Sequence, residues 1–173
     1  RELIDSTGAA PEFKEEEIAR FVRGLVWNAM VLDSIGVRRI SIALRGPDAI
    51  WHISPRLMRH ALGNLLRNAL RYSAPGSPVS VTIGTRGRRH WIHVRNRGEK
   101  IPADVLIRLF EPGKKSDTGG MGLGLYIAQT CAERMGGRLV YGSTTAATVF
   151  SIVLEDASCP SLSVLPRSTG LAS

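Results

Sequence analysis

Apolar positions recur along most of the chain with the spacing of elements that each bury one face. A helical spacing of i, i+3, i+4, i+7, i+8 and i+11 predicts a first helix from about Lys14 to Gly36, and its apolar members are Ile18, Phe21, Val22, Leu25, Val26 and Ala29. A second helix is predicted from Pro55 to about Tyr72, because Ser54 suits the N-cap and proline the first helical position. A last helix is predicted from about Gly122 to Met135.

Alternating apolar and polar residues between these helices predict strands. The expected strands are Arg38–Leu44, Ala49–Ile53, one around Val79–Ile83, one around Ile92–Val94, Arg138–Gly142 and Thr148–Leu154. A short helix is expected after Pro102 and ends near Phe110. Neighbouring strands are expected to form hairpins, so the pattern indicates an α+β two-layer sandwich rather than a doubly wound parallel sheet.

Composition places this pattern in one globular domain. The 173 residues have a net charge of +8 and no apolar run near the ~20 residues that a membrane-spanning helix needs, so we expect a cytoplasmic domain without membrane contact. The basic residues are scattered without interleaved aromatics, which argues against nucleic-acid binding. Two cysteines without metal-type spacing argue against zinc. We expect residues 1–13 to be a linker, 14–155 the domain and 156–173 a disordered tail, in a piece of a longer protein.

The candidate chemistry begins on the second helix. Asn64 and Asn68 are four residues apart, so they share a face at the edge of the apolar stripe, and Arg71 and Tyr72 follow one turn later. A carboxamide oxygen is a hard, neutral ligand that suits Mg²⁺ together with phosphate oxygens. Asparagine inside a helix is unfavourable by several tenths of a kcal/mol relative to alanine. Two such residues therefore favour a functional role over a purely structural one.

Two further segments carry polar or small residues where a ligand would need them. The run from Gly119 to Leu125 is rich in glycine and leads into a helix, whose N-terminal N–H groups favour phosphate. Strand alternation places Asn96 on the same face as Ile92 and Val94, where it can hydrogen-bond a base edge in an apolar pocket.

In this order, the segments resemble the asparagine, first-glycine, phenylalanine and second-glycine boxes of sensor histidine kinases. The matching segments are residues 64–73, 96–102, 109–112 and 120–125, and the resemblance extends over about Lys14–Glu155. It implies the Bergerat, or GHKL, ATPase fold, with a mixed, mostly antiparallel sheet of about five strands covered on one face by three helices.

The resemblance also implies roles for individual residues, with ATP and Mg²⁺ as the cofactors. It places Asn64 and Asn68 in the catalytic machinery, with Asn68 as the Mg²⁺ ligand, Arg71 on phosphate, Tyr72 packed at the nucleotide and Asn96 on the adenine amino group. The remaining residues implied to bind ATP are Gly98, Ile101, Phe110, Lys114, Lys115, Gly120, Gly122, Leu123, Gly124, Leu125 and Thr148.

The chain departs from the family pattern in the first glycine box. Asn96 stands where the family usually has Asp, and Lys100 stands where it has a second glycine. From the resemblance we expect Asn96→Asp to strengthen adenine recognition, because it restores the usual residue. A degenerate regulatory module, or pseudokinase, remains an alternative, and so does an anti-sigma-type serine kinase.

The reaction and its partners follow from what the chain holds and lacks. Gyrase-type and chaperone-type ATPases place Glu, a base for water, at the position of Asn64, and asparagine cannot abstract a proton there. Phosphoryl transfer to a protein is therefore favoured over hydrolysis. His52, His60, His90 and His93 lack the sequence context of a phosphoacceptor. We expect the acceptor on a dimerisation and histidine-phosphotransfer domain upstream, a response regulator as the next partner, and a parent protein that can be an inner-membrane receptor.

Overall fold

The computed structural model describes residues 10–32, 40–46, 49–111 and 123–155. Eleven helices and strands lie in this part of the chain. In order they are β1 (Lys14–Glu17), α1 (Ile18–Leu32), β2 (Ile40–Arg45), β3 (Ile50–Ile53), α2 (Pro55–Tyr72), β4 (Val79–Arg86), β5 (Arg89–Asn96), α3 (Ala103–Leu106), α4 (Gly124–Arg134), β6 (Arg138–Thr144) and β7 (Ala147–Glu155).

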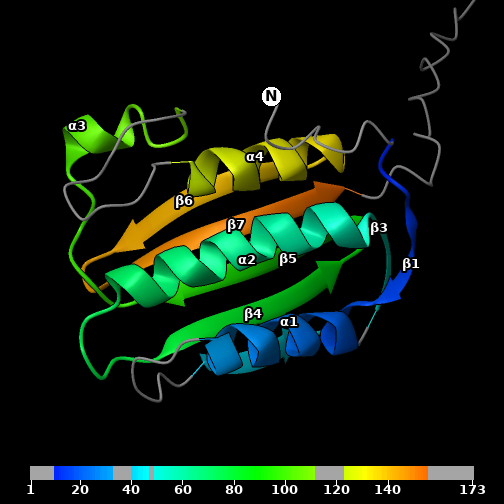
Figure 1. Cartoon of the computed structure of the whole chain (residues 1–173), viewed down its shortest axis with the longest axis horizontal. Coiled ribbons are helices and arrows are strands. Elements are labelled where there is room, and N and C mark those ends of the chain that lie inside the picture. The colour runs from blue at the N-terminus through cyan, green and yellow to red at the C-terminus, as the bar shows by residue number, and fades with distance from the viewer. Residues whose placement is uncertain (1–9, 33–39, 47–48, 112–122, 156–173) are drawn as a thin grey trace, which may run out of the picture.

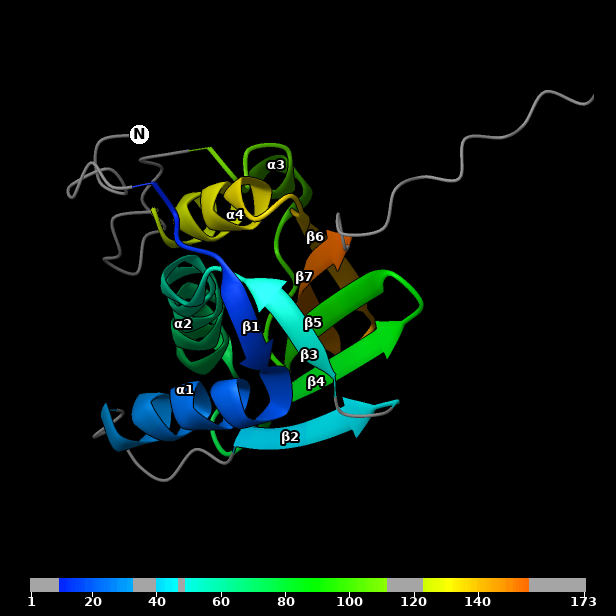
Figure 2. The ribbon, with the colours of Figure 1, turned by 90° about the vertical axis from the view of Figure 1, so that its right-hand side faces the viewer.

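A five-stranded sheet forms one layer of the molecule and helices form the other. The strand order is β2-β4-β5-β7-β6, with β2 and β4 parallel and the other neighbours antiparallel. Helices α1, α2 and α4 cover one face of this sheet (Figure 1), and the edge-on view separates the two layers (Figure 2). The predicted α+β sandwich, with a mixed, mostly antiparallel sheet under three helices, is confirmed.

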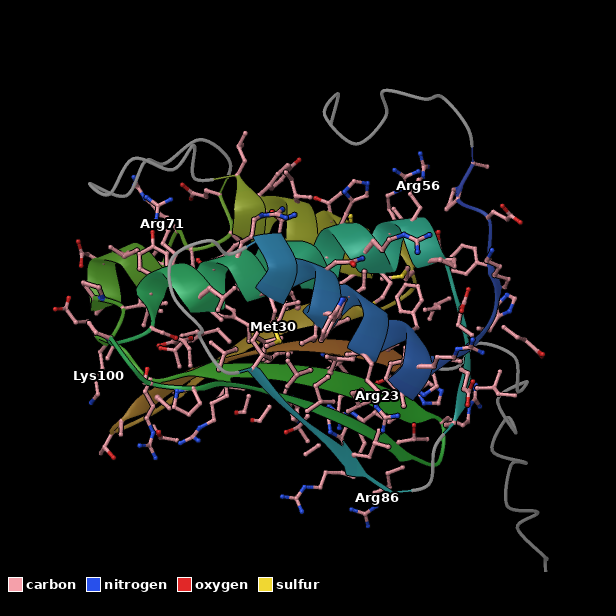
Figure 3. The ribbon with its side chains drawn as sticks, turned by 60° about the horizontal axis from the view of Figure 1, so that its bottom comes forward. Arg23, Met30, Arg56, Arg71, Arg86 and Lys100 are labelled. Carbon is pink, nitrogen blue, oxygen red and sulfur yellow. The ribbon has the colours of Figure 1, made fainter. Side chains whose placement is uncertain are left out.

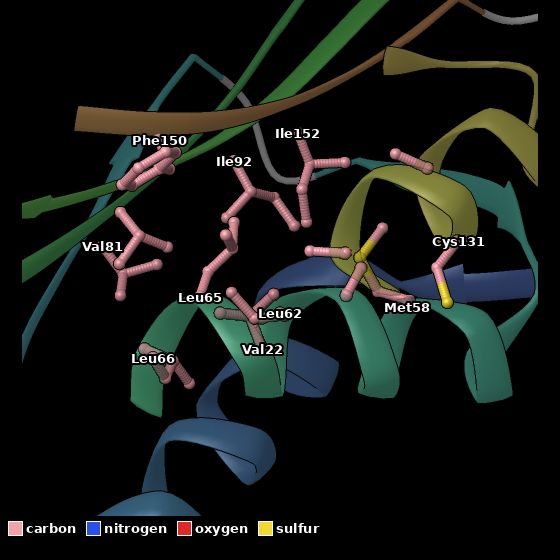
Figure 4. Packing of buried hydrophobic residues seen from close by; sticks show 14 of the residues in the cluster. Val22, Met58, Leu62, Leu65, Leu66, Val81, Ile92, Cys131, Phe150 and Ile152 are labelled. Atoms are coloured by element: carbon pink, nitrogen blue, oxygen red, sulfur yellow. The ribbon is translucent and has the colours of Figure 1, made fainter. Parts of the chain in front are cut away.

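The core lies between the sheet and α2, which runs along the middle of the helical layer. Leu62 and Leu65 of α2 are fully buried, as are Ile92 of β5 and Ile152 of β7 (Figure 4). Burial of a large aliphatic side chain contributes roughly 1.5–3 kcal/mol. The sheet therefore fixes the position of α2, and with it the position of every polar side chain that α2 carries.

Helix α2 has the bounds that the sequence predicts. Pro55 occupies its first turn, and the helix ends at Tyr72 because Ser73 adopts an extended backbone. The Ser73 hydroxyl donates to the carbonyl oxygen of Ala69 at 2.7 Å, which satisfies one carbonyl of the last turn. Ser54 occupies the N-cap position as predicted, but its hydroxyl makes no capping hydrogen bond.

The N-terminal part differs from the prediction in two ways. Residues Lys14–Glu17 form a strand that pairs antiparallel with β3, and the helix begins only at Ile18. The glutamates of this strand have no apolar periodicity of their own. The predicted start of the first helix at Lys14 is therefore wrong by four residues. Strands β2 and β3 do not form the expected hairpin, because β2 pairs in parallel with β4. The buried Trp51 instead ties β3 to β4, donating its indole N–H to the Thr85 hydroxyl at 3.1 Å.

The length of one further helix differs from the prediction, and that of another agrees with it. Helix α3 contains only Ala103–Leu106, and turns continue the chain to Phe110. Helix α4 is described from Gly124 to Arg134, close to its predicted bounds. Within the described residues, no helix is long and apolar enough to cross a membrane.

Candidate functional site

The described members of the predicted site gather at one end of the molecule. This end holds the C-terminus of α2, the end of β5, the start of β7 and the start of α4, on the left in Figure 1. Residues that are far apart in the sequence thus lie around one corner. The sheet and α2 create this corner because their packed elements terminate together there.

Asn64 lies on α2 with both ends of its carboxamide engaged. Its Nδ2 donates to the backbone carbonyl of His60 at 2.8 Å, and its Oδ1 accepts from Nη2 of Arg67 at 2.8 Å. The same Oδ1 lies close to Gly124, the first residue of α4, where an added Cβ would lie 3.3 Å away. Asn64 therefore meets the start of the helix that follows the glycine-rich segment.

The next turn of α2 presents the remaining residues of the asparagine box. Asn68 is partly exposed, and Arg71 and Tyr72 are exposed. The guanidinium carbon of Arg71 lies 5.6 Å from the centroid of the Tyr72 ring. Helix α2 carries no acidic residue, so its outer side offers cations and carboxamides but no carboxylate. That charge pattern suits a polyanion.

Asn96 closes β5 on the face that the helices cover. Only 4% of its surface is exposed, and it pairs across the sheet with Thr148 of β7, which is buried as well. Its Nδ2 donates to the backbone carbonyl of Tyr72 at 3.3 Å. The inward position of Asn96 agrees with the strand alternation, and the hydrogen bond joins the end of β5 to the end of α2.

Gly98 brings the chain after β5 against the end of α2. A Cβ at Gly98 would collide with the carbonyl oxygen of Tyr72. Two hydrogen bonds support this approach: the Ala74 N–H donates to the Arg97 carbonyl at 2.7 Å, and the Ser77 hydroxyl donates to it at 3.3 Å. Ala74, Ser77 and the Arg97 carbonyl are framework groups that sequence reasoning missed, since nothing local predicts a bond across 20 residues or more.

Lys100 does not fill this corner. Its side chain is exposed, and it extends from the loop at the same end of the molecule as Arg71 (Figure 3). The loss of the usual glycine therefore adds a surface cation rather than a side chain inside the site.

The described apolar residues that the sequence assigns to the site are partly buried. Ile101, Phe110 and Leu125 are partly buried and pack against the hydrophobic core, and Leu123 is partly buried immediately before α4. Lys114, Lys115, Gly120 and Gly122 lie outside the described residues, as do the expected tail and most of the expected linker.

Three of the four histidines make side-chain contacts within the fold, and these are His52, His90 and His93. His52 stacks on Phe13, with ring centroids 5.7 Å apart, and the buried His90 stacks on Trp51 at 4.8 Å. Nδ1 of His93 is 2.7 Å from the Ser151 hydroxyl, and burial lowers the pKa of its imidazole. His60 is exposed on α2, where its backbone carbonyl accepts from Asn64.

Within the described residues, no three His, Cys, Asp or Glu side chains gather as a metal site built from them would require. A divalent cation at this corner would need the carboxamide oxygens of α2 together with the oxygens of a ligand.

Comparison with known proteins identifies the family. Residues 53–158 match the family described as histidine kinase-, DNA gyrase B- and HSP90-like ATPase, and the chain belongs to it. Its relatives include the probable sensor kinase SilS of Salmonella typhimurium, 33% identical over 68% of this chain and 26% of the relative. They also include the sensor protein VanSC of Enterococcus gallinarum, 37% identical over 53% of this chain and 27% of the relative. The chain thus spans about a quarter of these proteins.

Solved structures share the fold. The catalytic domain of histidine kinase ThkA superposes with a TM-score of 0.76 over 84% of this chain and 96% of that domain, at 20% identity. The Acinetobacter baumannii histidine kinase AdeS gives a TM-score of 0.68 over 90% of this chain and 73% of that one, at 16% identity. The chain therefore has the fold of a histidine kinase catalytic domain.

Proposed function

We propose that this chain is the ATP-binding catalytic domain of a sensor histidine kinase, which transfers the γ-phosphate of ATP to a histidine on a domain outside the chain. Family membership and the sensor kinases among its relatives support this function. The observation that carries it is that α2 meets the end of β5 through Tyr72 and Asn96, and the start of α4 through Asn64 and Gly124, so that three elements meet at one corner of the sandwich.

The residues at this corner fit a magnesium–nucleotide complex. Asn68 offers a neutral oxygen to Mg²⁺, which when bound neutralises phosphate charge, and Arg71 supplies a cation beside it. Gly124 opens a helix whose first N–H groups point to where an anion is favoured. Asn96 offers hydrogen-bonding groups to a base in a largely apolar setting. Gly98 keeps the loop against α2.

The remaining predicted contacts complete the proposal. We assign the edge of the nucleotide pocket to Ile101, Phe110, Leu123, Leu125 and Thr148, and the phosphate side to Lys114, Lys115, Gly120 and Gly122.

Asn64 supports phosphoryl transfer over hydrolysis. A hydrolase of this family needs a base at that position to activate water, and a carboxamide has none to offer. Both ends of the Asn64 carboxamide are already hydrogen-bonded within α2, to His60 and Arg67. Its carboxamide is therefore fixed beside the start of α4, while the reaction depends on positioning and charge neutralisation.

The proposed function also defines the partners of the domain. The phosphoacceptor is a histidine on a dimerisation and phosphotransfer domain, and a response regulator then receives the phosphoryl group. The domain acts in the cytoplasm, where ATP and the response regulator are available.

Incubation with γ-labelled ATP tests the proposal. The chain alone should remain unlabelled, and a purified histidine-bearing helical domain of the parent protein should acquire an acid-labile label when mixed with it. Transfer should be slow, because the tether that raises the effective concentration is missing. Asn68→Ala should abolish it.

Other outcomes favour the two alternatives. Acid-stable label on a serine would indicate a serine kinase. Absence of both transfer and Mg-ATP binding would indicate a regulatory module, for which the unusual Asn96 and Lys100 are the specific observations.

A further inference from the structure

Arg67 is the cation that α2 places beside Asn64. Its Nη2 donates to Oδ1 of Asn64 at 2.8 Å, across one turn of the helix. Its Nη1 lies next to Gly63, where an added Cβ would be 3.6 Å away, so the guanidinium extends back along α2 toward the N-terminal end of the helix. The Arg67 side chain is exposed. Neither the sequence patterns nor the family resemblance gives it a role.

The Asn64 oxygen that accepts from Arg67 also faces the start of α4. A Cβ added at Gly124 would lie 3.3 Å from this oxygen. The guanidinium of Arg67 is therefore one hydrogen bond away from a residue that lies against the N-terminus of α4, whose first N–H groups favour an anion. Neither α2 nor the first turn of α4 carries an acidic residue, so no carboxylate of these segments competes for the guanidinium.

The order of residues along α2 gives the direction in which a bound nucleotide would extend. The proposed base contact is at the C-terminal end of α2, where Asn96 donates to the carbonyl of Tyr72, and the proposed Mg²⁺ ligand, Asn68, lies one turn earlier. Asn64, with the Arg67 guanidinium beside it, lies a further turn back. Tyr72 and Asn64 are eight residues apart, which is about 12 Å of helix. A nucleotide with its base at Asn96 and its magnesium at Asn68 would therefore extend its last phosphate toward Asn64 and the start of α4.

We propose that Arg67 is a phosphate-binding residue of this site, which contacts the γ-phosphate of ATP and makes the site distinguish ATP from ADP. The inference rests on the proposed function and adds a residue that responds to the length of the phosphate chain. A guanidinium has five N–H donors in a planar fork, so Arg67 can hold Asn64 with one nitrogen and bind phosphate oxygens with the others. ADP ends one phosphate earlier and leaves this contact unmade.

The choice of nucleotide separates this role from a purely structural one. If Arg67 only held the carboxamide of Asn64, its loss would affect the binding of both nucleotides alike. A contact to the γ-phosphate affects ATP alone. Arg71 lies beside Tyr72, one turn nearer the proposed base contact, so its cation serves the phosphates that ATP and ADP share.

Calorimetric titration of Mg-ATP and Mg-ADP into the wild type, Arg67→Gln and Arg67→Lys tests the proposal. Arg67→Gln removes the charge and keeps a hydrogen-bond donor. It should weaken ATP binding about fivefold and leave ADP binding within about twofold of the wild type, because one exposed charge-assisted contact is lost. Arg67→Lys keeps the charge without the planar fork and should give an intermediate ATP affinity. High salt should diminish the effect of Arg67→Gln on ATP binding.

Arg23→Gln is the matched control. It makes the same chemical change at an exposed position of α1 (Figure 3), so it should alter neither affinity.

The outcomes distinguish the inference from the proposed function. If the wild type binds ATP, and Arg67→Gln weakens ATP and ADP equally or weakens neither, the inference is wrong and the proposed function stands. A wild type that binds no nucleotide overturns both. Slow transfer of the γ-label by Arg67→Gln, with an unchanged ratio of ATP to ADP affinity, would assign the arginine to the acceptor domain and would also overturn the inference. If Arg67→Gln does not fold, Arg67→Lys decides, since an ATP to ADP ratio equal to that of the wild type contradicts the γ-phosphate contact.

Discussion

Asn64 of α2 and Gly124 of α4 meet side by side, so that a Cβ added at Gly124 would lie 3.3 Å from Oδ1 of Asn64. This contact joins the asparagine box to the last glycine of the glycine-rich segment. Alanine at position 124 would force the Asn64 carboxamide to move by a few tenths of an ångström, and Asn64 is held by its bonds to His60 and Arg67. The start of α4 thus packs closely beside Asn64.

A double-mutant cycle measures this coupling. Gly→Ala inside a helix ordinarily stabilises by up to ~1 kcal/mol. We expect Gly124→Ala to lose most of that gain in the wild type and to recover it in an Asn64→Ala background, with a coupling energy of about 0.5–1 kcal/mol in urea unfolding. Additive effects of the two substitutions would show that the residues do not press on each other.

Gly98→Ala should destabilise the fold and weaken Mg-ATP binding together. The new Cβ collides with the Tyr72 carbonyl, a backbone group that cannot turn aside, and overpacking of this kind costs about 1–3 kcal/mol. Gly24→Ala is the matched control, since Gly24 lies on α1 with nothing within 4 Å, and it should leave binding unchanged and stabilise slightly. Thermal melts and titrations of both variants check this. Unaltered stability of Gly98→Ala would contradict the close approach.

Cys131 should be protected from thiol reagents in the folded protein. It is a fully buried residue of α4, and burial raises the pKa of its thiol to about 11, so the reactive thiolate is scarce at pH 8. In a Cys159→Ser background, we expect modification to follow unfolding and to accelerate with added urea. The pKa of Cys131 in the folded protein lies above the usual value of 9.0. The contribution of its neutral thiol to folding stability is therefore complete below pH 9 and is lost as the pH rises through about 11. Rapid labelling of the native protein at pH 8 would contradict this burial.

Sequence patterns predicted the elements whose signals are local. The bounds of α2 follow from Pro55 and from an apolar stripe, and the inward position of Asn96 follows from its alternation with Ile92 and Val94. Both features depend on neighbouring residues and on the period of one element.

The features that the sequence did not predict are contacts between distant segments. Strand β2 precedes α2 in the sequence and β4 follows it, yet the two strands pair in parallel. The expectation of hairpins favours pairing between strands that are neighbours in the sequence. The bond from Asn96 to Tyr72 spans 24 residues and uses a backbone carbonyl, which has no residue-type signature. Strand β1 was not predicted for the same reason, because its glutamates form a strand only by pairing with β3, a distant segment of the chain.

The most direct test of the account is calorimetric titration of Mg-ATP into this chain and its Asn68→Ala variant, with Asn28→Ala as the matched control on an exposed face of α1. Asn68 lies beside the buried face of α2 and is itself only partly buried, so its replacement should change the free energy of unfolding by no more than ~0.5 kcal/mol. The account predicts that the wild type and Asn28→Ala bind ATP in a magnesium-dependent manner, and that Asn68→Ala loses this binding while its melting temperature is retained. Equal binding of Mg-ATP by the wild type and a folded Asn68→Ala would contradict the assignment of the site to this corner.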